Sequence, residues 1–136
     1  MAFTDIETVR AHAGSPDPER VPDSLLDHAI SEAHTVLLRD LLSQYLDSED
    51  ETLKLGETEL ATAYLFRSLA RNRAATGREV ATLHLRLNET KGVPGILRQA
   101  AEEERRAFGR LAPFLRKRAT PFGFRLAGPK RARDRD

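Results

Sequence analysis

The stretch that decides the fold is Glu57-Thr-Glu-Leu-Ala-Thr-Ala-Tyr-Leu-Phe-Arg-Ser-Leu-Ala-Arg-Asn-Arg-Ala-Ala75. Its small and apolar residues recur at helical spacing in two adjacent rows. The first row is Leu60, Tyr64, Leu65, Ser68 and Leu69, and the second is Ala63, Phe66 and Ala70. A surface helix carries one apolar stripe, so two rows predict a helix that is packed from several sides. The charges at its ends suit the helix dipole, with Glu57 and Glu59 in the first turn and Arg71 and Arg73 in the last. A C-terminal stop signal, Gly77, follows.

Composition places this helix in one small domain. The chain has 136 residues, of which 40% are hydrophobic, which is enough for a single modest core. It has no cysteine, which excludes disulfides and thiolate metal sites. No apolar run approaches the roughly 18–20 residues of a membrane span, and the N-terminus lacks the pattern of a signal peptide. We therefore expect a soluble protein that is made and assembled in a cytoplasm, with no membrane partner.

Two helices are predicted before the central one. Thr4 and Glu7 fit a capping box for a short helix that stops at Gly14, and the prolines within residues 15–20 predict a loop. A longer helix begins at Pro22 or Asp23 and runs to about Leu46. Its apolar line is Leu26, Ile30, Ala33, Leu37 and Leu41. Residues 47–52 form an acidic loop that lacks the ligand pattern of a calcium site.

One helix is predicted after the central one. Residues 79–87 fit either a strand or a helix, with helix or irregular structure slightly favoured, and residues 88–95 form a loop. The last helix begins near Gly95, and Pro113 predicts a kink or an end of that helix. Its predicted inner face is Leu97, Ala101, Glu104, Phe108, Leu111 and Leu115, with Ala100, Ala107 and Phe114 alongside. Its predicted outer face is Glu102, Glu103, Arg105, Arg106 and Arg110, with Glu102 and Arg106 paired. The fold class is therefore all-α, a small four-helix bundle.

The C-terminal segment differs from the rest of the chain. Residues 116–136 carry a net charge of +6, whereas the preceding 115 residues carry −5, which predicts an acidic partner for the segment. We divide the chain into a helical domain, 1–115, and a basic extended arm, 116–136. Apolar residues alternate in the arm, which favours docking on another chain over a disordered solubilising tail. The candidate partner-binding residues are Phe114, Arg116, Lys117, Arg118, Phe122, Phe124, Arg125 and Leu126.

Chemistry-bearing patterns are few. The four histidines, His12, His28, His34 and His84, are scattered, and His28 and His34 are six residues apart, on different faces of a helix. Neither a glycine-rich phosphate loop nor a nucleophile elbow is present. We therefore expect no enzyme activity, no cofactor and no bound metal.

The organisation of residues 3–75 resembles a family of small phage proteins. Phe3-Thr-Asp-Ile-Glu-Thr-Val-Arg10 is similar to their short opening helix. Val21-Pro-Asp-Ser-Leu-Leu-Asp-His-Ala-Ile-Ser-Glu-Ala33 is similar to their second helix, and Leu60-Ala-Thr-Ala-Tyr-Leu65 to their third. The whole resembles the head-tail connectors, or adaptors, of tailed bacteriophages. The likeness lies in order, length and spacing, and the long basic tail departs from it.

That resemblance implies a structural virion protein at the neck, assembled in the host cytoplasm. It implies a homo-oligomeric ring of about 12 subunits beneath the portal protein. The ring would join the portal to the next neck or tail protein, with viral DNA passing through the lumen without sequence-specific binding. Two alternatives stay open: a helical nucleic-acid-binding protein with a basic tail, and a small helical regulatory partner protein.

Overall fold

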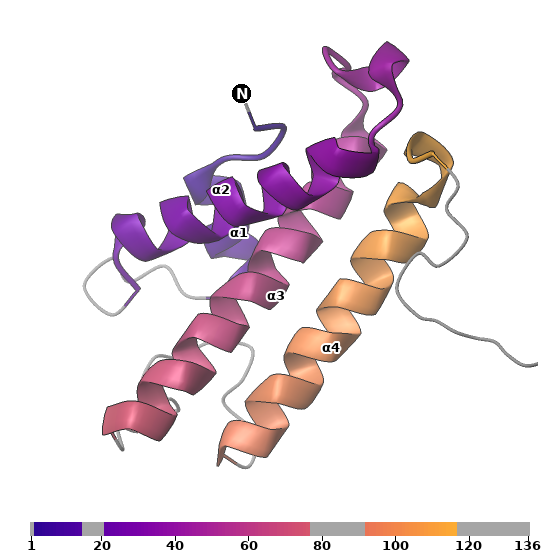
Figure 1. Ribbon diagram of the computed structural model, residues 1–136. Helices are drawn as coiled ribbons and strands as arrows, with labels where there is room; N and C mark the ends of the chain where they lie inside the picture. The colour runs from indigo at the N-terminus through magenta and orange to yellow at the C-terminus, as the bar shows by residue number, and fades with distance from the viewer. Residues whose placement is uncertain (1, 15–20, 77–91, 117–136) are drawn as a thin grey trace, which may run out of the picture.

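A computed structural model describes residues 2–14, 21–76 and 92–116 (Figure 1). These residues form four α-helices and two short 3-10 turns, without a strand in the described part. The helices are α1 (Ile6–Ala13), α2 (Asp23–Asp40), α3 (Glu51–Thr76) and α4 (Gly92–Leu111). The prediction of an all-α four-helix bundle is confirmed. None of the described helices is both long and apolar enough to cross a membrane. The ambiguous residues 79–87 lie outside the described ranges.

The centre of the bundle is α3. Every residue from Gly56 to Phe66 is buried, and so is every member of the two rows that the sequence indicated. Figure 1 shows why: α4 runs beside α3 along most of its length, while α2 crosses α3 on another side. The short α1 packs against both α2 and α3. The prediction of a central core helix is therefore confirmed.

The beginning of α3 differs from the prediction. The helix begins at Glu51, because Oδ1 of Asp50 accepts a hydrogen bond from the backbone N–H of Thr52 and caps its first turn. Glu57 and Glu59 thus lie inside the helix rather than in its first turn, and both are buried. Their charges must be balanced by contacts within the bundle, because the helix dipole acts only near the ends.

The cap of α1 is also one residue away from the prediction. Asp5 rather than Thr4 is the N-cap, and its side chain accepts a hydrogen bond from the backbone N–H of Thr8 at 2.8 Å. That hydrogen bond lowers the pKa of Asp5. Gly14 ends the helix as predicted, in the left-handed conformation with a φ of 84°.

The end of α2 comes six residues earlier than predicted. The backbone turns extended at Leu41, and Leu41 forms an isolated antiparallel bridge with Leu115. The N–H of Arg116 donates to the carbonyl of Asp40 at 2.7 Å, and the N–H of Leu42 to the carbonyl of Phe114 at 3.0 Å. A 3-10 turn, η1 (Ser43–Tyr45), follows. A contact with the far end of the chain therefore replaces the last helical turns.

The inner face of α4 is rotated from the prediction. The buried residues on this helix are Gly95, Ile96, Ala100, Glu103, Ala107 and Leu111. Leu97, predicted to face the core, is 46% exposed, and Ala101 is exposed as well. Glu104 is half-buried and pairs with Arg67 of α3. The helix ends at Leu111, and Pro113, where a kink or an end was predicted, lies in the 3-10 turn that follows, η3 (Ala112–Phe114). The prediction that Glu103 lies on the outer face was wrong.

Gly56 of α3 lies directly against the side chain of Leu111 of α4. A Cβ atom on Gly56 would lie 2.5 Å from Cδ2 of Leu111, which is fully buried. We predict that Gly56→Ala lowers the free energy of unfolding by about 1–3 kcal/mol, because overpacking outweighs the gain in helix propensity. A Cβ on Gly109 would meet nothing within 4 Å, so Gly109→Ala should stabilise the protein by up to about 1 kcal/mol. Urea titrations of both variants measure this difference, and a loss of stability in both would contradict it.

Candidate functional site

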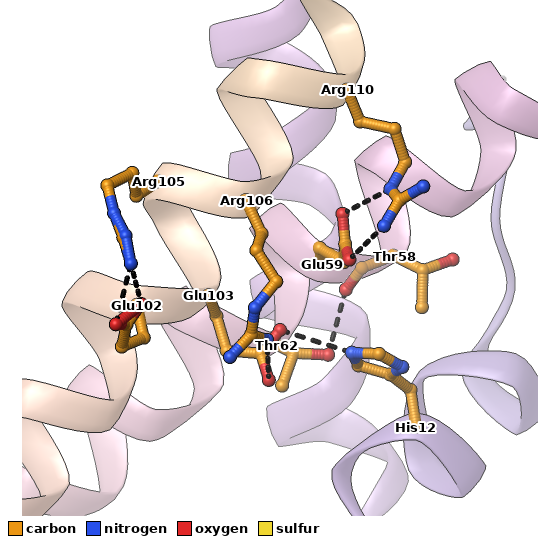
Figure 2. Close-up of polar contacts among 9 residues, drawn as sticks. All are labelled: His12, Thr58, Glu59, Thr62, Glu102, Glu103, Arg105, Arg106 and Arg110. Atoms are coloured by element: carbon orange, nitrogen blue, oxygen red, sulfur yellow. Dashed lines mark hydrogen bonds and ion pairs between the residues drawn. The ribbon is translucent and has the colours of Figure 1, made fainter.

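The first polar feature of the bundle is a charge cluster between α1, α3 and α4, made of His12, Glu59, Glu103, Arg106 and Arg110 (Figure 2). Nε2 of His12 lies 3.1 Å from Oε1 of Glu103, and Nη1 of Arg106 lies 3.3 Å from Oε2 of the same carboxylate. Arg110 binds Glu59 through two hydrogen bonds, with Nε at 2.9 Å and Nη2 at 3.2 Å. The cluster thus ties three helices together.

The two carboxylates of this charge cluster are buried, whereas the two guanidinium groups that pair with them are partly exposed. The side chains of Glu103 and Glu59 are 0% and 4% exposed, whereas those of Arg106 and Arg110 are about 40% exposed. The hydrogen bonds and the charge of Glu59 raise the pKa of Arg110. A buried carboxylate is tolerated only when a positive group and hydrogen bonds compensate it. Each carboxylate has its own arginine, so the cluster stabilises the junction of the helices.

A metal ion is the chemical alternative for this charge cluster. His12, Glu59 and Glu103 offer ligand atoms that all lie within 4.8 Å of one another, and imidazole with carboxylates suits a divalent transition metal. Arg106 and Arg110 already neutralise the two carboxylates. A cation would have to displace these guanidinium groups, so the arrangement favours a structural ion-pair cluster.

A second buried carboxylate, Glu57, holds the N-terminal segment. Its Oε1 accepts hydrogen bonds from the backbone N–H groups of Phe3 at 2.7 Å and Thr4 at 2.9 Å. Its Oε2 accepts from Nδ1 of His34 at 2.7 Å. Next to it, the hydroxyl groups of Thr4 and Thr58 are 2.7 Å apart. Glu57 therefore joins α2, α3 and the segment before α1.

The candidate interaction site is a groove beside this N-terminal segment. We call it the acidic groove; it has a volume of about 410 Å³. Its lining residues are Ala2, Phe3, Leu46, Asp47, Ser48, Glu49, Asp50, Glu51 and Lys54. Leu46 is 50% exposed, and the ring of Phe3 is fixed edge-on against His34 with 5.5 Å between ring centres. The groove thus combines apolar surface with four carboxylates and one lysine, which suits a basic ligand that carries apolar side chains.

The structure separates the predicted arm residues into two groups. Phe114 is buried and its ring packs edge-on against Tyr45, with 4.9 Å between ring centres. The backbone of Arg116 is hydrogen-bonded to Asp40. Phe114, which was predicted to bind a partner, therefore belongs to the core of its own domain. Lys117, Arg118, Phe122, Phe124, Arg125 and Leu126 lie outside the described residues.

The sequence did not predict several of the contacts in these polar clusters. His12 and Glu103 are 91 positions apart, and nothing local to either residue indicates that they meet. The predicted pair of Glu102 and Arg106 is also wrong, since Glu102 binds Arg105 and Arg106 binds Glu103. One signal was available: Glu57 and Glu59 sit inside an otherwise small and apolar run, a position where a carboxylate needs a buried partner.

The difference in burial between Glu103 and Glu102 gives a testable prediction. Both residues pair with an arginine three positions later, but only Glu103 is fully buried. We predict that Glu103→Ala lowers the free energy of unfolding by about 1–3 kcal/mol, because the contacts of this buried carboxylate with His12 and Arg106 are lost and a buried space is left. The matched Glu102→Ala should stay within about 0.5 kcal/mol. Equal effects in denaturant titrations would contradict the burial of Glu103.

Comparison with known proteins adds no assignment. Searches against protein-family profiles, curated proteins and solved structures find no match to this chain.

Proposed function

We propose that this protein is a structural subunit of the head-tail junction of a tailed bacteriophage, a connector that forms a ring beneath the portal. The observation that carries the proposal is the layout of the described helices. A short helix, α1, is followed by α2 after Pro22 and then by the central helix α3, in the order of the family that residues 3–75 resemble. The buried stretch Leu60–Leu65 of α3 coincides with the third segment of that resemblance.

The distribution of exposed charge supports association between copies. The stretch from Leu41 to Glu51 exposes Asp47, Glu49, Asp50 and Glu51 and contains no arginine or lysine. The positive charge of the chain is concentrated in residues 116–136, which carry a net charge of +6. Acidic and basic regions on one subunit favour head-to-tail contacts, which close into rings when the rotation permits.

Binding of nucleic acid is the less favoured alternative. Of the four exposed arginines on α4, Arg105, Arg106 and Arg110 are each paired with a glutamate of the same domain. Phosphate contacts would have to compete with these pairs, and the acidic surface of α2 would repel a nucleic acid backbone. The DNA of the proposed assembly is therefore a passenger in the lumen, and the basic residues serve contacts between proteins.

The test combines genomic context with assembly. A portal gene and a major capsid gene near the coding sequence would identify the portal partner, which is then purified with this protein. We expect co-sedimentation with the portal and rings in negative-stain images. Binding should weaken without vanishing at high salt, because salt screens charges but not apolar contacts. The proposal would be overturned if the protein did not co-sediment with the portal, or if it bound DNA strongly and salt-dependently by itself.

A further inference from the structure

We propose that the acidic groove is the receptor for residues 117–126 of a neighbouring copy of the chain. This inference rests on the proposed ring and names the contact that would link its subunits. It starts from three observations: the chemistry of the groove, the composition of the segment, and the place where the described chain ends.

The acidic groove has the chemistry of a peptide receptor. Phe3 and Leu46 provide apolar surface, and Asp47 and Glu49 are exposed at its rim. The side chain of Asp50 caps α3 by accepting a hydrogen bond from the backbone N–H of Thr52. Asp47 and Glu49 precede that cap in the chain, so their carboxylates are not used in it. Four carboxylates in a short stretch repel one another, and a basic ligand relieves this repulsion. The same charge disfavours phosphate, so nucleic acid and anionic lipid are poor occupants.

The segment 117–126 is complementary to this groove. It reads Lys-Arg-Ala-Thr-Pro-Phe-Gly-Phe-Arg-Leu and contains three basic residues and no acidic residue. Its two phenylalanines and its leucine alternate, so in an extended peptide they would share one edge. That edge could contact Phe3 and Leu46 while the basic side chains reach the rim. Paired apolar and charged recognition of an extended peptide is a common mode of docking.

The described chain ends near the start of the loop that lines the groove. The backbone N–H of Arg116 donates a hydrogen bond to the carbonyl of Asp40, next to the bridge between Leu115 and Leu41. Leu46, which lines the groove, is five residues after Leu41 in the chain. Donor segment and acceptor groove are thus different surfaces of one subunit. When such surfaces pair between copies, the contact is heterologous, and repeating it builds a ring where the rotation closes.

The experiment uses two full-length variants that each lose one side of the contact. The groove variant is Asp47→Lys with Glu49→Lys, and the segment variant is Phe122→Ser with Phe124→Ser. The matched control, Asp27→Lys with Glu32→Lys, makes the same charge change on the exposed face of α2. Circular dichroism and thermal melting check that every variant is folded. Sedimentation velocity at low salt then measures the association of each purified protein, with no portal present.

We expect the wild-type protein to associate, and each contact variant to lose at least about tenfold in association constant. The control should stay within about twofold. Mixing the groove variant with the segment variant leaves one intact groove and one intact segment, so it should give a complex of two subunits. Adding Lys117→Glu with Arg118→Glu to the groove variant should restore association through reversed charges.

Three results would overturn the inference. One is a wild-type protein that stays monomeric at low salt, which would place the segment elsewhere or on its own groove. Another is an equal loss in the control, which would indicate a general effect of charge. The third is a mixture of the two variants without a complex. Because the portal is absent, self-association can succeed while portal binding fails, so the inference and the proposed function are tested separately.

Discussion

Replacing Glu57 by alanine is expected to lower the free energy of unfolding by about 3–5 kcal/mol, one of the largest effects of any single polar substitution in this protein. The carboxylate is 0% exposed and accepts three hydrogen bonds, from the backbone of Phe3, the backbone of Thr4 and the ring of His34. Alanine would leave the N–H of Thr4 buried without its acceptor, and it would leave a space inside the bundle.

Glu57→Gln is the matched control for this prediction. The amide oxygen can still accept from Phe3 and Thr4, and the amide nitrogen can donate to Nδ1 of His34 when that histidine adopts its other tautomer. Glutamine fills the same volume, so the loss should be less than half that of alanine. Denaturant titrations compare the two variants. Similar losses would mean that the negative charge, rather than the hydrogen-bond geometry, is what the site requires.

A local measurement separates this mechanism from general destabilisation. The N–H groups of Phe3 and Thr4 are held by the Glu57 side chain, so their hydrogen exchange should accelerate in Glu57→Ala more than that of amides in the middle of α3. Because Phe3 lines the acidic groove, the same variant should also weaken self-association. Uniform acceleration of all amides would contradict a local role for Glu57.

How much of the fold is readable from the sequence depends on whether the deciding contact is local. The central position of α3 was predicted correctly, because two rows of apolar residues have no other simple explanation than burial on several sides. Gly14 was also read correctly as a helix stop, because its signal is carried by a single residue. These features depend on neighbours within a few positions.

The errors in predicting α2 and α4 arose where contacts between distant parts of the sequence determine the structure. The end of α2 depends on the pairing of Leu41 with Leu115, 74 positions later, and residues 41–46 contain no glycine or proline that would mark a stop. The rotation of α4 depends on Glu103, which hydrophobic periodicity places in solvent. That carboxylate is buried because His12 and Arg106 compensate it. No pattern in one segment contains this information.

The candidate site was predictable only in its charge. The acidic character of residues 47–52 and the basic character of the C-terminal segment are visible in the sequence. The groove itself is made by bringing Phe3 next to Leu46, which requires Glu57 and His34 to fix the N-terminal segment. The packing of Phe114 inside its own domain was missed for a related reason, since Tyr45, against which its ring packs, belongs to a turn that was expected to be helix.

Replacing Leu65 by alanine is the second change expected to have a large effect, a loss of about 2–5 kcal/mol in the free energy of unfolding. Leu65 is 0% exposed on α3, at the centre of the core, where neighbouring helices restrict relaxation into the space that is left. The cost therefore includes both the lost burial of the side chain and the remaining cavity.

Leu97→Ala is the matched control, because it makes the same chemical change on α4 at a position that periodicity assigned to the core. The side chain is 46% exposed, and its neighbour Ile96 occupies the buried position instead. We expect a loss below about 1 kcal/mol, because half of the removed surface is already in water and alanine favours the helix. Urea unfolding curves of the two variants measure both losses, provided that the dependence of the free energy of unfolding on urea concentration has the same slope as in the wild type. If Leu97→Ala cost as much as Leu65→Ala, the inner face of α4 would be the one that the sequence suggested, and Glu103 would have to point outward.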